Sequence, residues 1–161
     1  MSRILRYVFF CLTLIAFAPA AFSDTETSPV SALRAFFGDV ANSDDRAAWN
    51  LFTHHTQNGV VKSVADSEKM DPVKVRELFD NADQSIKDGF WASFNNSVQA
   101  STFVTSQMQS TGPDKDAPGS VTITMANGRR VEILMYLEGA DWKVGWFETF
   151  FPSGQVSVPG Q

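Results

Sequence analysis

The hydrophobic positions of this chain change their spacing once, from a helical period in the first half to alternation in the second. Leu33, Phe36, Phe37 and Val40 recur three and four residues apart, which predicts an amphipathic helix over Ser31–Ala41. From about residue 97 the apolar positions alternate with polar ones, as in half-buried strands. Helices first and strands last predict an α+β domain.

Two more helices are predicted before the period changes. Asp44 or its neighbour Ser43 can cap a helix that runs through Phe52, and Asn58-Gly59 is expected to break the chain after it. Asp71-Pro72 is a strong helix start, because the aspartate can accept bonds from free amides and proline suits the first turn. The apolar face of this third helix and the glycine expected to end it are Val75, Leu78, Phe79, Ala82, Ile86 and Gly89.

The alternating half predicts four antiparallel strands. They are expected at Ser97–Met108, Ser120–Ala126, Arg129–Glu138 and Trp142–Phe150, with a loop at Ser110–Gly119. A three-residue turn that ends in a left-handed Gly128 pairs apolar residues with apolar residues across the second and third strands. The register predicted across this turn and the next is Val121 with Ile133, Ile123 with Val131, Met135 with Val144, Ile133 with Trp146, and Val131 with Glu148.

The two faces of the predicted sheet differ in polarity. The face expected to lie against the helices is apolar apart from Glu148: Val121, Ile123, Met125, Val131, Ile133, Met135, Leu137, Trp142, Val144 and Trp146. The opposite face is half apolar: Thr122, Thr124, Glu132, Leu134, Tyr136, Lys143 and Phe147. We expect this second face to be covered by a second copy of the chain, forming a homodimer, or by the C-terminal tail, residues 152–161.

Three short motifs in this order resemble the nuclear-transport-factor-2-like superfamily, in the ketosteroid isomerase and polyketide cyclase type of cone. They are Phe-Phe-Gly-Asp at 36–39, Trp-Asn-Leu-Phe at 49–52 and Trp-Lys-Val-Gly-Trp at 142–146. The resemblance implies one domain over residues 31–151, in which N-terminal helices pack in the concave face of a strongly curved antiparallel sheet. Such a cone has an apolar pocket at its open end, and the superfamily contains both enzymes and non-catalytic binding modules of bacterial envelopes.

The first 23 residues have the pattern of a secretory signal peptide. Arg3 and Arg6 precede an apolar run over Tyr7–Ala18, too short to span a bilayer, and small residues end at Ser23. We therefore expect an exported protein, periplasmic or secreted, with a flexible leader at residues 24–30. The single cysteine, Cys11, lies in the apolar run, so the expected mature chain carries no thiol and no disulfide.

Charge argues against nucleic acid as a partner. Removing two arginines with the signal peptide leaves 11 of the 13 basic residues against 18 acidic ones, a formal charge of −7. The 14 phenylalanines and four tryptophans indicate heavy aromatic burial or an aromatic-lined cavity. No cofactor is expected, and no stable membrane span after cleavage.

Glu148 is the sharpest candidate for proton chemistry. A carboxylate among Val131, Val144 and Trp146 would be desolvated and would hold its proton closer to neutrality, as a general base or acid requires. The alternative is that Glu148 lies past the packed core and faces water. His54 and His55 are predicted to end the second helix near the pocket mouth, with a structural role favoured over proton exchange and no metal expected there.

We therefore expect a non-catalytic exported domain that binds a small apolar ligand or an envelope protein through its pocket or sheet face. The alternative is a cofactor-free lyase or isomerase that uses Glu148, His54 or His55 as proton carrier. The residues expected to line the pocket are Trp49, Trp91, Val131, Ile133, Met135, Trp142, Trp146 and Glu148.

Overall fold

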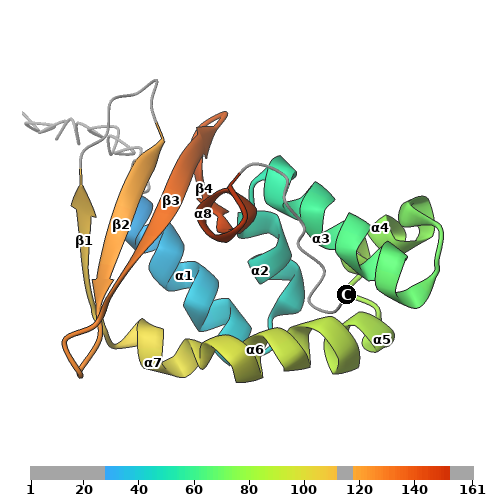
Figure 1. Ribbon diagram of the computed structural model, residues 1–161, viewed down its shortest axis with the longest axis horizontal. Coiled ribbons are helices and arrows are strands. Elements are labelled where there is room, and N and C mark those ends of the chain that lie inside the picture. Colours follow the sequence, from blue (N-terminus) through green and yellow to red (C-terminus); the bar gives the residue numbers. More distant parts are fainter. Residues whose placement is uncertain (1–27, 112–117, 153–161) are drawn as a thin grey trace, which may run out of the picture.

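The computed structural model describes residues 28–111 and 118–152. Within these ranges seven α-helices precede a four-stranded antiparallel sheet, with helix α1 against the strands (Figure 1). The predicted α+β class is confirmed. The expected signal peptide and residues 24–27 of the leader lie outside the described residues, as do residues 112–117 of the predicted loop and 153–161 of the tail.

The elements follow one another with short connections. The helices before the sheet are α1 (Pro29–Ala41), α2 (Asp45–Leu51), α3 (His54–Glu68), α4 (Pro72–Asp80), α5 (Gln84–Ile86), the π-helix (Lys87–Trp91), α6 (Ala92–Val98) and α7 (Ala100–Val104). The sheet consists of β1 (Gln107–Thr111), β2 (Gly119–Thr124), β3 (Arg130–Glu138) and β4 (Asp141–Gly145), in that order, and α8 (Trp146–Phe150) follows. None of the helices in the described ranges is long and apolar enough to cross a membrane.

Local capping chemistry explains where the first helices begin. Ser28 accepts a hydrogen bond from the backbone amide of Ser31, and Pro29 occupies the first turn, so α1 starts two residues before the predicted Ser31. The expected leader at 24–30 is therefore wrong in its last residues. Asp71 accepts a bond from the amide of Val73 and starts α4 as predicted.

Helix α3 is an element that the sequence pattern did not predict. Asn58-Gly59 was expected to break the chain, but both residues lie inside this 15-residue helix. Thr53 caps it by accepting the amide of Thr56 at 2.9 Å. The glycine is tolerated because the ring of Phe147 lies against it, where a Cβ atom would overlap the ring.

The long third helix of the sequence prediction is broken into several pieces. Helix α4 ends at Asp80, and Ala82 then has a positive φ of 50°. Gly89, expected to end this helix, lies instead within the π-helix. The predicted first strand at Ser97–Met108 is mostly wrong, because α6 and α7 occupy its first two thirds and β1 begins at Gln107. Phe103 packs there as a helical residue, stacked on Phe37 at 4.6 Å.

The register of the sheet is as predicted up to the end of β4. Val121 faces Ile133, Ile123 faces Val131 and Met135 faces Val144, and Gly128 has a φ of 80°. The two pairs predicted beyond this point, Ile133 with Trp146 and Val131 with Glu148, are wrong because the strand ends at Gly145 and the chain turns into α8. The hydroxyl of Thr149 helps to close that turn by donating to the Gly145 carbonyl at 2.6 Å.

The predicted cone is also wrong: the sheet is open and not strongly curled. A cone of this kind needs a long last strand that continues the curvature of the sheet. Here β4 has five residues and the following five form a helix, so the sheet ends where the curvature was expected. Residues 28–111 and 118–152 therefore form no cone with a pocket at its open end.

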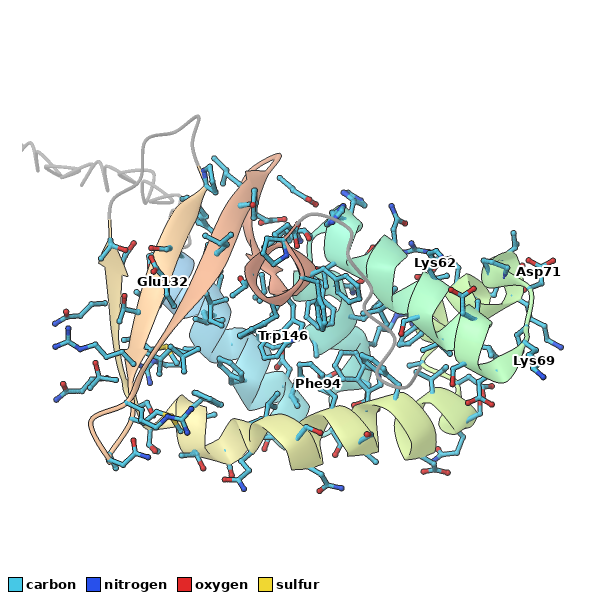
Figure 2. All side chains as sticks on the ribbon, in the orientation of Figure 1. Lys62, Lys69, Asp71, Phe94, Glu132 and Trp146 are labelled. Atoms are coloured by element: carbon cyan, nitrogen blue, oxygen red, sulfur yellow. The ribbon has the colours of Figure 1, made fainter. Side chains whose placement is uncertain are left out.

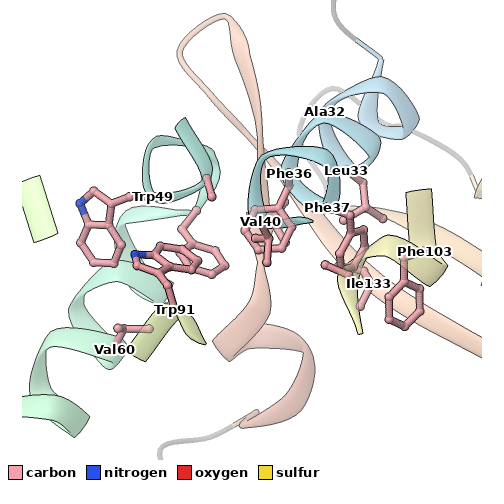
Figure 3. Packing of buried hydrophobic residues seen from close by; sticks show 14 of the residues in the cluster. Ala32, Leu33, Phe36, Phe37, Val40, Trp49, Val60, Trp91, Phe103 and Ile133 are labelled. Atoms are coloured by element: carbon pink, nitrogen blue, oxygen red, sulfur yellow. The ribbon is translucent and has the colours of Figure 1, made fainter. Parts of the chain in front are cut away.

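The core runs from the inner face of the sheet under α1 to the helices α2, α3, α4 and the π-helix (Figure 3). Leu33, Phe36 and Phe37 of α1 are fully buried. The apolar sheet face predicted from the sequence is confirmed at its centre, while its margin is open: Leu137 is 41% exposed. The buried strand residues are Val121, Ile123, Ile133, Met135, Trp142 and Val144.

Candidate functional site

A groove of about 770 Å³ lies between α3 and the segment that runs from α5 through the π-helix to α6. Helix α4 contributes Leu78 to its lining, and α8 contributes Trp146. The groove is on the helical side of the molecule, away from the site predicted inside a cone. Its apolar lining includes Val64, Leu78, Ile86, Phe90, Phe94 and Trp146.

Four aromatic rings follow one another along this groove and past its edge. Phe90 stacks on Phe94 with ring centroids 5.8 Å apart, and Phe94 meets Trp146 edge to face at 4.9 Å. Trp146 in turn contacts Phe150 at 4.6 Å, and Phe150 is 44% exposed. Figure 2 shows Phe94 and Trp146 close together between α6 and α8. The three lining rings are half-buried, so each keeps apolar surface that a ligand could cover.

The π-helix forms part of the groove wall through Gly89 and Phe90. A π turn holds one more residue than an α turn, which changes the direction of the side chains that follow it. Here Trp91 is buried and stacks on Phe52 at 5.9 Å, while its neighbour Phe90 lines the groove. Short π segments of this kind occur frequently at functional sites.

The rim of the groove is polar and nearly uncharged. Ser63 and Ser67 of α3 and Ser93 and Ser97 of α6 contribute hydroxyl groups, with members of each pair four residues apart and therefore on one helix face. Ser97 donates its own proton to the Ser93 carbonyl at 2.8 Å. Glu68, at the end of α3, is the charged residue of the lining in the described part of the chain.

Helix α8, which carries Trp146, is attached to α3 by a polar network. The two carboxylate oxygens of Glu148 accept hydrogen bonds from the hydroxyl groups of Thr53 and Thr56, each at 2.7 Å. Thr56 also accepts the backbone amide of Phe147 at 3.0 Å. Both threonines are buried. Glu148 therefore connects α8, which carries Trp146, to the start of α3.

Glu148 lies in helix α8, and the prediction that it lies on the apolar face of the last strand is wrong. Burial raises the pKa of Tyr136, and the negative charge of Glu148 raises it further, so the carboxylate lies within electrostatic range of this phenol. The expected surroundings of Val131, Val144 and Trp146 are replaced by two hydroxyl donors. This arrangement uses Glu148 as a hydrogen-bond acceptor between two elements.

The two histidines begin α3, whereas they were predicted to end the second helix. His54 is exposed, and its Nδ1 lies 2.8 Å from a carboxylate oxygen of Glu138 in β3. The backbone amide of His54 donates to the same carboxylate at 3.1 Å. His55 is exposed as well. The structure therefore brings His54 to Glu138, and Glu148 to the two threonines, as separate contacts.

The predicted lining residues are divided among core and surface. Ile133 and Met135 are buried under α1, and Trp91 is buried against Phe52. Trp49 is also buried, stacked on Phe79 at 4.3 Å, with its indole N–H donating to Asp80 at 2.8 Å. Of the eight predicted residues, Trp146 lines the groove and Trp142 lines a second hollow, while Val131 is half-buried at the sheet margin.

That second hollow, of about 520 Å³, lies between α1, α2 and β4. Its polar lining includes Asp39, Asn50 and Lys143, and the Lys143 ammonium donates to the Asn50 carbonyl at 2.9 Å. Burial, and then the nearby charge of Asp44, raises the pKa of Asp39. The Lys143 ammonium is thus engaged with the Asn50 backbone, at the edge of this second hollow.

Trp146 is the one lining residue of the groove that the sequence predicted, and Phe90 and Phe94 are among those it missed. Their spacing of four residues places them on one face of a helix, and this was the available signal. Metal chemistry has no support from geometry, because no three His, Cys, Asp or Glu side chains gather within residues 28–111 and 118–152.

Comparison of this chain with protein-family models, curated proteins and solved structures gives no match. The resemblance to the nuclear-transport-factor-2-like superfamily stays a prediction. The functional proposal is therefore based on the geometry of the groove.

Proposed function

We propose that this protein is a binding domain whose groove between α3 and α6 holds the apolar part of a small ligand. The observation that supports this most directly is the half-buried aromatic row of Phe90, Phe94 and Trp146. A volume of about 770 Å³ is within the usual range of small-molecule sites. The predicted export to the periplasm or exterior is compatible with this role and remains part of the proposal.

Burial of apolar area supplies the binding energy in this proposal. Covering about 100 Å² of ring and aliphatic surface is worth roughly 2.5 kcal/mol before the entropic cost of binding. Serine hydroxyl groups at the rim can bond to a polar end of the ligand without demanding a charge. The groove thus favours an elongated, mainly apolar molecule.

Catalysis receives less support than binding. The polar groups of the lining are serine hydroxyls and the exposed carboxylate of Glu68, which do not form an acid and base pair around a buried point. Glu148, the former candidate for a lyase or isomerase, has both oxygens occupied by threonines. A proton carrier in those roles would need a free oxygen directed at a substrate.

A partner protein is the second candidate occupant of the groove. Ser63 and Ser67 face the groove from one rim, and Ser93 and Ser97 from the other. Small residues four apart on both rims leave room for the close approach of an apolar helix. The homodimer predicted through the mixed sheet face remains a separate proposal, since that face lies on other elements.

The test is a fluorescence titration with N-phenyl-1-naphthylamine, a neutral probe that becomes bright in apolar sites. We expect saturable binding by the purified protein. Ser67→Trp should weaken it at least about tenfold, because an indole at the rim would fill the groove without disturbing the core. Val73→Ala is the matched control, since Val73 is 68% exposed on α4 outside the lining. Equal binding by the parent and Ser67→Trp proteins would refute the proposal.

A further inference from the structure

The charges around the groove indicate which kind of polar end the ligand has. This inference rests on the proposed function. We propose that the groove takes a single-chain amphiphile with a positively charged head, of the alkylammonium class, with the head at Glu68 and the chain on the aromatic row. Three features of the described residues support this assignment: the position of Glu68, the end of α3, and a described lining that contains no Lys or Arg.

Glu68 is the last residue of α3 and lines the groove. Its carboxylate is exposed, so a headgroup can reach it from the solvent. Ser67 beside it adds a hydroxyl oxygen that can accept a hydrogen bond from an ammonium group. One full charge and one neutral acceptor thus lie side by side in the lining.

The helix itself adds negative potential at the same place. Helix α3 has 15 residues, and its unpaired terminal carbonyl groups form the negative end of the helix dipole. Lys69 ends the helix in the left-handed conformation, with a φ of 53°, and its amide bonds to the Ala65 carbonyl. Cations are stabilised at such helix ends, whereas anions are disfavoured.

Two basic residues near the groove are engaged by other protein groups. Lys62 of α3 is paired with Asp66 at 2.5 Å. Arg76 of α4 donates to Gln57 at 3.0 Å and to Asn58, and lies over the Trp49 ring. Lys69 follows Glu68 but does not belong to the lining, and no Lys or Arg is among the described lining residues. A carboxylate or phosphate headgroup would therefore find no cation in the groove.

The experiment compares three probes with the same twelve-carbon chain: dodecylammonium, dodecanol and dodecanoate, all below their micellar or solubility limits. Each competes with N-phenyl-1-naphthylamine at low salt and again at about 0.5 M salt. We expect dodecylammonium to bind about fivefold more tightly than dodecanol at low salt, and dodecanoate to bind most weakly. The preference for the cation should shrink to less than about twofold at high salt, because the charges at this end are exposed.

The variant Glu68→Gln removes the negative charge of the lining and leaves the shape of the groove nearly unchanged. We expect this variant to lose most of the preference for dodecylammonium while its affinity for dodecanol stays unchanged. Glu77→Gln is the matched control, because Glu77 is an exposed carboxylate of α4 that does not line the groove, and it should leave the order of the three probes unaltered.

The outcomes distinguish the two proposals. Binding of dodecanol without any preference for dodecylammonium, or a preference for dodecanoate, would overturn the inference about charge and leave the apolar groove intact. A preference for dodecylammonium that survives Glu68→Gln would overturn the assignment of the head to Glu68. Failure of all three probes to compete would overturn the proposed function, and the inference with it.

Discussion

The molecule has two halves that are equally rich in aromatic rings but use them differently. In the sheet half, which we define as α1, α2, α7 and β1–β4, Phe36 and Phe37 have no exposed surface. In the groove half, which comprises α3 to α6, the π-helix and α8, Phe79 is buried as well, but Phe90 and Phe94 are only partly buried. Phenylalanine thus belongs to the closed core in both halves and lines an open groove in the second one alone.

What differs between the halves is the surface that faces the rings. The apolar stripe of helix α1 is covered by the sheet on one side and by α2 and α7 on others, and its residues are buried. Helix α6 contains no buried residue, and the groove separates it from α3. Apolar surface without an opposing layer is uncommon in a stable domain, and this is why we propose the groove half as the side that binds a ligand.

The sharpest way to test this contrast is to truncate one ring in each half. Phe36→Ala should lower the free energy of unfolding by about 3–5 kcal/mol, since it leaves a cavity in a fully buried site. Phe94→Ala should cost only about 1–2 kcal/mol, because water already reaches part of that ring. Urea unfolding followed by circular dichroism measures both values. Equal losses would mean that the rings of the groove half belong to the core after all.

A second test concerns how α8 is held, since this helix contains no buried residue. Glu148→Ala should lower the free energy of unfolding by about 2–3 kcal/mol, because it leaves the hydroxyl groups of the buried Thr53 and Thr56 without their acceptor. Calorimetric or urea unfolding measures the loss. The neutral Glu148→Gln should cost less, about 1 kcal/mol, because its amide oxygen can still accept one of the two bonds.

A double-mutant cycle with Thr56→Val shows whether the bond itself is responsible. We expect a coupling of about 1 kcal/mol or more between Glu148 and Thr56. Thr56→Ser keeps the hydroxyl group and should keep this coupling, while the loss of a buried methyl group costs about 1 kcal/mol by itself. Additive effects of Glu148→Ala and Thr56→Val would show that α8 is held by other contacts. In that case α8 would be held by apolar packing, as the elements of the sheet half are, and not by its hydrogen bonds to α3.

The elements that the sequence predicted well are those whose signals are local. Asp71 caps its helix beside a proline, and Gly128 sets the register of β2 and β3 through one turn. The wrong predictions concern segments whose structure depends on a contact with a residue far away in the sequence. Gly59 stays helical because Phe147 packs on it from 88 positions further along the chain, and no pattern near Gly59 reports that contact.

The candidate site was harder to predict because it depends on the shape of the sheet. The alternation over Trp142–Phe150 is equally compatible with a continuing strand and with a strand followed by a short helix. Once the chain turns at Gly145, Trp146 points to a groove between helices, and Glu148 meets threonines instead of valines. Only Trp146 of the predicted lining residues reaches this groove.

The smallest effect we predict comes from two helical glycines that differ only in what faces them. In the sheet half, a Cβ on Gly38 of α1 would meet nothing within 4 Å, so Gly38→Ala should stabilise the protein by about 0.5–1 kcal/mol through helix propensity. In the groove half, a Cβ on Gly59 of α3 would overlap the Phe147 ring and displace α8. Gly59→Ala should therefore cost about 1 kcal/mol net, because the strain of overpacking exceeds the same gain in propensity.

Thermal unfolding of the two variants gives shifts of opposite sign if α8 packs on α3 through this contact. A stabilising Gly59→Ala would instead mean that Phe147 moves aside freely, so that the wall of the groove that carries Trp146 is loosely held.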